Sequence, residues 1–168
     1  MTLPTSGPLS LSDIKGEFGG NTSPALKDYY AGGSFVPLGT TGTYGAVPTS
    51  GTIGIFNFYG TSNLRVFASN VTGAASGPHP SGVVTSTTSP NTSPSGGTSP
   101  YTYAWSVVST SSGTTPTISS YTAQNPIWSI GVADGTPSVS TWKVTVTDAH
   151  SSTASTTITV TLTWTNIS

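Results

Sequence analysis

The stretch Trp142-Lys143-Val144-Thr145-Val146-Thr147 alternates apolar with polar residues, and the alternation returns in Thr157-Ile158-Thr159-Val160-Thr161-Leu162-Thr163-Trp164. A period of two places successive side chains on opposite faces of a β-strand. The residues between the two runs, Asp148-Ala149-His150-Ser151-Ser152, favour a turn, so we predict a β-hairpin. This hairpin predicts an all-β fold in which each strand buries one face.

Working outward from the hairpin, we expect more short strands with turn residues between them. These runs are rich in β-branched and aromatic residues and cover 65–68, 83–84, 101–108 and 127–132. Such spacing is typical of a β-sandwich. The Ser-, Thr- and Pro-rich stretch 86–97 predicts a long exposed loop. We therefore assign residues 63–168 to one sandwich domain.

Charge is scarce in this chain. Only 5% of the residues are charged and the formal net charge is −1, whereas ordinary globular proteins carry about 25% charged residues. No electrostatic field would collect nucleic acid, so we expect no such partner. No apolar run approaches the roughly 18 residues of a membrane helix, so we expect no membrane insertion. The opening residues also lack the basic and apolar regions of a signal peptide.

An internal repeat organises the first 62 residues. Pro4-Thr5-Ser6-Gly7 returns unchanged as Pro48-Thr49-Ser50-Gly51, and apolar residues follow at the same offset, so that 3–16 matches 47–60. Two copies are too few for a solenoid, which needs about three. None of the matching positions carries catalytic chemistry. The repeat indicates either two equivalent edges of one small fold or a unit that docks on a larger assembly.

Short helical turns are the predicted local structure of this repeat-containing segment. Leu11, Ile14 and Phe18 recur at helical spacing behind a cap at Ser10 or Ser12, although the same stretch also fits the start of a strand. Residues 24–30 are a second helical candidate, and 53–59 fit a strand or one helical turn. We expect residues 1–62 to be a small irregular anchor that cannot complete its own core and becomes ordered on a partner.

Aromatic and aliphatic residues of this anchor are the candidate docking residues, because aromatic side chains often hold interfaces together. The predicted docking set is Leu9, Leu11, Ile14, Phe18, Tyr29, Tyr30, Phe35, Ile53, Ile55, Phe56, Phe58 and Tyr59. In the sandwich, Trp105 and Trp142 fit core positions. Trp128 and Trp164 are candidates for an exposed binding face, where an indole ring would stack on a sugar or a protein.

Catalytic chemistry is not indicated by the sequence. The chain has no cysteine, and its two histidines, His79 and His150, fall in predicted loops. Three of the five acidic residues lie in the predicted anchor, which disfavours the facing carboxylates of a glycosidase. Asp134 is better explained by a turn. We therefore predict no catalytic residue, no metal site, no cofactor and no enzymatic activity.

Two family resemblances add to these predictions. Tyr103-x-Trp105, Trp142-x-Val144-x-Val146-Thr147-Asp148-Ala149 and Ile158-x-Val160 together resemble immunoglobulin-like domains of the PKD type, over residues 64–165. The resemblance implies a core tryptophan and a sheet closed by the last hairpin strand. The chain lacks the more acidic loops of that family, so the resemblance does not imply calcium or carbohydrate binding.

The second resemblance lies in the anchor. Leu3-Pro4-Thr5-Ser6-Gly7-Pro8-Leu9-Ser10-Leu11-Ser12-Asp13-Ile14, with Asp28-Tyr29-Tyr30-Ala31-Gly32-Gly33 and the second repeat copy, resembles leader segments of tailed-bacteriophage structural proteins. It implies a virion protein, made in the host cytoplasm, that serves as a tail or fibre component or as a capsid decoration protein. The implied partners are capsid, tail or fibre subunits and further copies of the chain. The alternative is an adhesion module that binds a host surface or its glycans.

Overall fold

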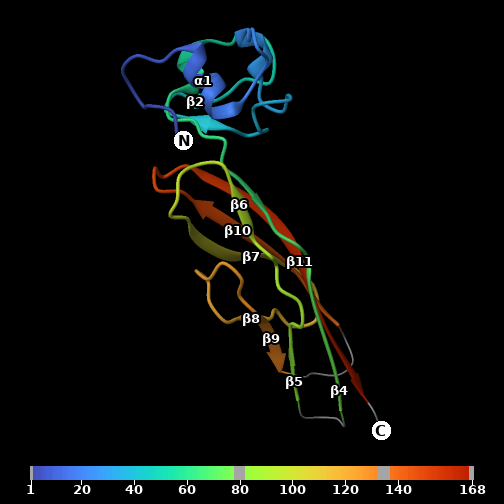
Figure 1. Cartoon of the computed structure of the whole chain (residues 1–168). Helices are drawn as coiled ribbons and strands as arrows, with labels where there is room; N and C mark the ends of the chain where they lie inside the picture. Colours follow the sequence, from blue (N-terminus) through green and yellow to red (C-terminus); the bar gives the residue numbers. More distant parts are fainter. Residues whose placement is uncertain (1, 78–81, 132–136, 167–168) are drawn as a thin grey trace. The chain divides into compact units, whose positions relative to one another are not determined.

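Two compact units make up the computed structural model, which describes residues 2–77, 82–131 and 137–166 (Figure 1). Unit 1 comprises Met1–Arg65 with the two loops Ser95–Tyr101 and Thr147–Thr153. Unit 2 comprises Val66–Pro94, Thr102–Val146 and Ala154–Ser168. Unit 1 thus includes two loops that the sequence analysis assigned to the second domain.

Unit 1 is built from short elements joined by irregular chain. They are helix α1 (Leu11–Phe18), the 3-10 helices η1 (Leu26–Tyr29) and η2 (Ile55–Phe58), and the two-residue strands β1 (Thr41–Gly42) and β2 (Gly45–Ala46). The predicted cap of α1 is Ser10, whose hydroxyl accepts a hydrogen bond from the backbone of Asp13, and the helix ends at Gly19. The strand alternatives for 9–18 and 53–59 are wrong, since both stretches are helical.

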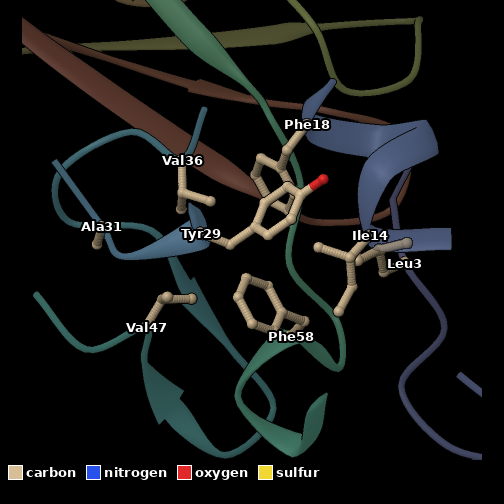
Figure 2. Packing of buried hydrophobic residues seen from close by; sticks show 8 residues of the cluster. All are labelled: Leu3, Ile14, Phe18, Tyr29, Ala31, Val36, Val47 and Phe58. Atoms are coloured by element: carbon tan, nitrogen blue, oxygen red, sulfur yellow. The ribbon is translucent and has the colours of Figure 1, made fainter. Parts of the chain in front are cut away.

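A hydrophobic core fills unit 1, contrary to the expectation that this segment cannot complete one. Figure 2 shows the cluster with Tyr29 in its middle. Its buried members are Leu3, Ile14, Phe18, Tyr29, Ala31, Val36, Val47 and Phe58. The rings of Phe18 and Phe58 meet edge to face at 6.1 Å, and Tyr29 packs against Phe58 at 6.3 Å. Such aromatic pairs stabilise a core beyond the area they bury.

Unit 2 is a β-sandwich, which confirms the all-β fold class. One sheet has the order β4-β11-β10-β7 and the other the order β5-β9-β8, while β3 and β6 form a separate pair. The strands are β3 (Arg65–Phe67), β4 (Val71–Gly77), β5 (Val83–Thr85), β6 (Ser93–Ser95), β7 (Thr102–Ser112), β8 (Thr117–Ile118), β9 (Trp128–Gly131), β10 (Ser138–Thr147) and β11 (Thr153–Asn166).

Three tryptophans join the two sheets of unit 2. Trp128 on β9 meets Trp105 on β7 at 5.2 Å and Trp142 on β10 at 5.8 Å, both edge to face. The predicted core positions of Trp105 and Trp142 are therefore confirmed, since these residues are 4% and 1% exposed. The inward side chains of β10 and β11, among them Val144 and Val160, complete this core.

Three observed strands of unit 2, β4, β6 and β8, were not predicted. Sequence periodicity missed β4, which pairs in parallel with β11 so that Val71 lies opposite Val160. The predicted exposed loop 86–97 is also partly ordered against the sandwich. It contains β6, and Thr92 within it is buried, with its backbone amide bonded to the Asn125 side chain.

Candidate docking site

The two copies of the repeat begin their helices in the same way. In the first copy, a carboxylate oxygen of Asp13 accepts a hydrogen bond of 2.8 Å from the backbone N–H of Ser10. In the second, the amide oxygen of Asn57 accepts one of 2.8 Å from the N–H of Gly54. Asn57 thus replaces Asp13 at the third helical position. The sequence repeat is therefore a structural repeat.

A tyrosine holds the Pro-Thr-Ser-Gly turn of each copy. Tyr59 donates its hydroxyl to the carbonyl of Gly7 at 2.6 Å, and the next residue, Gly60, donates its N–H to the carbonyl of Pro4 at 2.9 Å. We call this four-residue arrangement a tyrosine clasp. Its geometry fixes both ends of the turn.

The second turn is held by the same arrangement. Tyr30 donates its hydroxyl to the carbonyl of Gly51, and Ala31 donates its N–H to the carbonyl of Pro48 at 2.9 Å. Both clasp tyrosines directly follow a core aromatic, Tyr29 in one case and Phe58 in the other. Since each clasp is tied to the core of unit 1, both turns are displayed from one rigid support.

The clasped turns present their side chains to solvent. Residues 5–7 and 49–51 are all exposed, and within the described residues no hydrogen bond engages the hydroxyls of Thr5, Ser6, Thr49 or Ser50. Gly7 and Gly51 have φ angles of 90° and 81°, a left-handed region that strongly favours glycine. The turns therefore fix the glycine for backbone reasons, whereas no hydrogen bond within the described residues requires the Thr-Ser hydroxyls.

The unusual property of this repeat is that its exposed Thr-Ser pair is identical in the two copies. Buried positions differ between the copies, as Leu3 corresponds to Val47 and Ile14 to Phe58. Surface substitutions usually change stability by less than about 0.5 kcal/mol, so packing does not explain an unchanged Thr-Ser pair. The two turns are therefore the candidate docking site of unit 1, and the sequence signal for them was the repeated phrase itself.

The structure places the predicted docking residues in three environments. Ile14, Phe18, Tyr29 and Phe58 are buried in the core of unit 1, so the expectation that a neighbouring subunit buries them is wrong. Half-buried residues packed against this core are Leu9, Leu11, Phe35, Ile53 and Ile55. Tyr30 and Tyr59 are the half-buried clasp tyrosines.

Exposed hydrophobic side chains in unit 1 are few and mostly unforeseen. Among the predicted docking residues, only Phe56 is largely exposed, at 55%. Leu38 and Tyr44 are more exposed, at 75% and 62%, and were not predicted. Tyr44 stacks edge to face on the clasp residue Tyr59 at 5.8 Å. It therefore adds apolar surface beside the clasp of the first turn.

The predicted exposed tryptophans do not form a binding face. Trp128 is completely buried, which corrects that expectation. Trp164 is half-buried, and its indole ring lies on the backbone of Gly77 and Gly82, where an added Cβ would come within 3 Å of the ring. The two residues therefore do not offer the pair of free rings that sugar stacking would use.

Asp148 is buried, and the hydrogen bonds of its carboxylate indicate a structural role. Its oxygens accept hydrogen bonds from the backbone N–H groups of Thr98, His150 and Ser152, at 2.8–2.9 Å, and from the hydroxyl of Thr2. Burial raises the pKa of this carboxyl, but the four hydrogen bonds outweigh it and hold the pKa below the ordinary value of 3.8. Asp148 therefore stays ionised and ties the loops of unit 1 together.

Catalytic and metal-binding groups do not gather in the described residues. Those residues contain no cluster of three or more His, Cys, Asp or Glu side chains that could hold a metal ion. His79 and Asp134 lie outside the described residues. No helix found there is long and apolar enough to cross a membrane.

Comparisons with known proteins give one structural similarity. No protein-family model matches the chain. No curated protein matches it either. The chain is similar to the solution structure of the PKD domain (329–428) from human KIAA0319, with 16% identity, a TM-score of 0.34, and coverage of 62% of this chain and 83% of that one. At this level the similarity carries no functional argument, and the sandwich assignment rests on the sheets and core of unit 2.

Proposed function

We propose that this chain is a non-enzymatic structural protein of a tailed-bacteriophage particle. Unit 1 holds it on the particle, and unit 2 is the immunoglobulin-like sandwich that it displays. Its partners are capsid, tail or fibre subunits, and it serves as a tail or fibre component or as a capsid decoration protein. The resemblance of residues 3–60 to phage leader segments supports this assignment.

One observation carries the docking role. Two exposed turns have the same sequence, the same glycine conformation and the same clasp, although the buried residues behind them have diverged. An external partner that contacts both turns explains why the exposed residues stay alike. Because the turns are equivalent, the partner must offer two equivalent surfaces, as the repeated subunits of a particle do.

Docking through these turns requires no reactive group. Each turn offers two hydroxyls that can donate or accept hydrogen bonds, and neither turn carries a charged residue that would repel a partner. Two weak contacts made by one rigid unit reinforce each other, since the second forms at high effective concentration. The buried, fully engaged carboxylate of Asp148 is likewise suited to holding loops rather than to catalysis.

Particle incorporation of a blocked variant tests this function. Ser6→Arg with Ser50→Arg places a long charged side chain on each turn without touching the core. Tagged full-length chains would be produced in the phage-infected host, and purified particles would be probed for the tag. We expect the wild-type chain on the particles and at least about a tenfold depletion of the double variant, which corresponds to a loss of 1.4 kcal/mol or more.

The matched control is Ser23→Arg with Ser34→Arg, two exposed serines of unit 1 outside the turns. This control should join particles as the wild-type chain does. If the wild-type chain is folded in the lysate but missing from particles, the virion role is wrong. If the wild-type chain and the blocked variant are incorporated equally, the virion role stands and the turns are not its docking site.

A further inference from the structure

A groove of about 330 Å³ adjoins the first of the two docking turns. The N-terminal segment contributes Leu3, Pro4 and Pro8 to its lining, and helix α1 contributes Asp13, Gly16 and Glu17. The two prolines directly flank the exposed residues 5–7. A partner that contacts the first turn would therefore also cover this groove.

Two carboxylates give the groove a negative lining. Asp13 and Glu17 are four residues apart on α1, so they lie on one face of the helix. They are two of the five acidic residues of the chain. Among the described residues that line the groove, none is basic. In a chain with so little charge, two acids in one groove indicate a place that favours a cation.

The architecture that the two copies of the repeat share does not call for either charge. In the second copy, the uncharged Asn57 caps its helix through the same 2.8 Å bond that Asp13 makes in the first. Thr61 takes the place of Glu17 in the second copy. The first copy therefore carries two charges that the repeat itself does without.

The two charges also lie where helix α1 disfavours them. Like charges four residues apart on a helix repel each other. Glu17 is the last residue but one of α1, where the negative end of the helix dipole disfavours a carboxylate. Asp13 is ionised at neutral pH, since hydrogen bonds from the hydroxyl and the backbone N–H of Ser10 lower its pKa from 3.8. A cation held in the groove would relieve this repulsion.

An arginine side chain of the docking partner is the occupant that fits this groove best. Its aliphatic stem can lie along Leu3 and the two prolines, while its planar head donates hydrogen bonds to carboxylates. Arginine also suits the second copy, where Phe56 takes the place of Ser12 and is 55% exposed, because a guanidinium stacks on aromatic rings. Lysine carries a more strongly hydrated point charge, which is less suited to either setting.

We propose that the groove beside the first turn receives an arginine side chain from the particle subunit on which unit 1 docks. The identity of that subunit rests on the proposed function, whereas the affinity of the groove for arginine can be measured without any particle.

Nuclear magnetic resonance of the isotope-labelled full-length chain tests this affinity. The probes are N-acetyl-arginine amide, its neutral analogue N-acetyl-citrulline amide, and N-acetyl-lysine amide. We expect the arginine compound to shift the backbone amide signals of residues 12–17, with a dissociation constant in the millimolar range. The citrulline compound should bind at least about tenfold more weakly, and the lysine compound should bind more weakly than the arginine compound. Added salt should weaken the binding of arginine.

Asp13→Asn with Glu17→Gln removes both charges and keeps both hydrogen-bond acceptors, and it should weaken arginine binding about tenfold or more. Asp28→Asn is the matched control, because Asp28 caps η1 through the N–H of Ala25 and does not line the groove. This control should bind arginine as the wild-type chain does. No shift at about 100 mM arginine compound would overturn the proposal. So would equal binding of the citrulline or lysine compound, or undiminished binding by the double variant.

Purified particles then show whether the groove takes part in docking. The double variant should be depleted from them about tenfold or more relative to the wild-type chain, and Asp28→Asn should not. Equal incorporation of the double variant would overturn the proposal while the virion role stands. A folded wild-type chain that binds arginine in solution but is missing from particles would instead overturn the proposed function, and with it the partner named for the groove.

Discussion

Asp148 shows how one residue links the stability of unit 1 to pH. Its carboxylate engages three backbone N–H groups and one hydroxyl in a buried position. Its pKa in the folded chain is lower than in the unfolded chain, so the folded state binds its proton less readily. The resulting stability is therefore present above the unfolded-state pKa and is lost as the pH falls through the folded-state pKa.

Asp148→Asn should lower the free energy of unfolding at pH 7 by about 1–3 kcal/mol, because a neutral amide is a weaker acceptor and points N–H groups at backbone donors. The loss should shrink as the pH falls below 3.8, because the carboxyl of the unfolded chain then takes up a proton while that of the folded chain is still ionised. Urea unfolding of both proteins at pH 7 and pH 3 measures this. Asp28→Asn is the control, since this helix-capping carboxylate accepts a hydrogen bond from one backbone N–H, that of Ala25, where Asp148 accepts three. An equal loss at both pH values would contradict the assignment.

At the scale of elements, the two tyrosine clasps should be energetically alike. Tyr30→Phe and Tyr59→Phe each remove one hydroxyl donor from a turn while keeping the aromatic ring. Each should lower the free energy of unfolding by about 0.5–1.5 kcal/mol, the net value of one hydrogen bond. Urea unfolding of the full-length chain gives both values. Tyr44→Phe, which removes an exposed hydroxyl outside the clasps, should change nothing.

Clear periodicity decided which elements could be predicted. Helix α1 and strands β10 and β11 follow from regular spacing of apolar residues, and the tryptophans of β7 and β10 were placed correctly in the core. Strand β4 was missed because its residues 73–77 are Gly, Ala, Ala, Ser and Gly, none of which favours a strand. The parallel partner β11 supplies the pairing that its own sequence does not indicate.

The sequence predicted the two turns of the candidate site but not the contacts that hold them. The repeated Pro-Thr-Ser-Gly phrase was visible in the sequence, but the tyrosine hydroxyl bonds of its clasps join residues 21 and 52 positions apart. The core of unit 1 takes single residues from many short segments, so no periodic pattern of apolar residues in the sequence predicts it. For this reason Phe58 and Tyr29 were taken for docking residues. Trp128 was misplaced because Ile127 and Val132 flank β9, so that the predicted strand 127–132 offers apolar residues on both faces.

At the scale of the whole molecule, each unit has a core of its own. All four tryptophans belong to unit 2, while the aromatic core of unit 1 contains only phenylalanine and tyrosine. Tryptophan fluorescence therefore reports the unfolding of unit 2. Amide hydrogen exchange, read peptide by peptide, reports both units.

Large-to-small substitutions should separate the two cores. Trp142→Ala and Phe58→Ala each empty a fully buried site and should cost about 3–5 kcal/mol. Trp142→Ala should shift the tryptophan fluorescence transition to lower urea and speed exchange in unit 2. Phe58→Ala should speed exchange first in unit 1. If both substitutions accelerated exchange equally throughout the chain, the cores would not be separate.

The parallel pairing of β4 with β11 has a consequence during biosynthesis. The side chain of Asn70, beside β4, accepts a hydrogen bond from the backbone N–H of Thr159 on β11, 89 residues later. Nearly all of unit 2 must therefore be synthesised before β4 can pair with β11. Distant contacts of this kind form slowly. A nascent chain would meanwhile expose the β-prone stretch 71–158, in which only three residues are charged. The yield of folded protein should therefore depend on chaperones and on growth temperature.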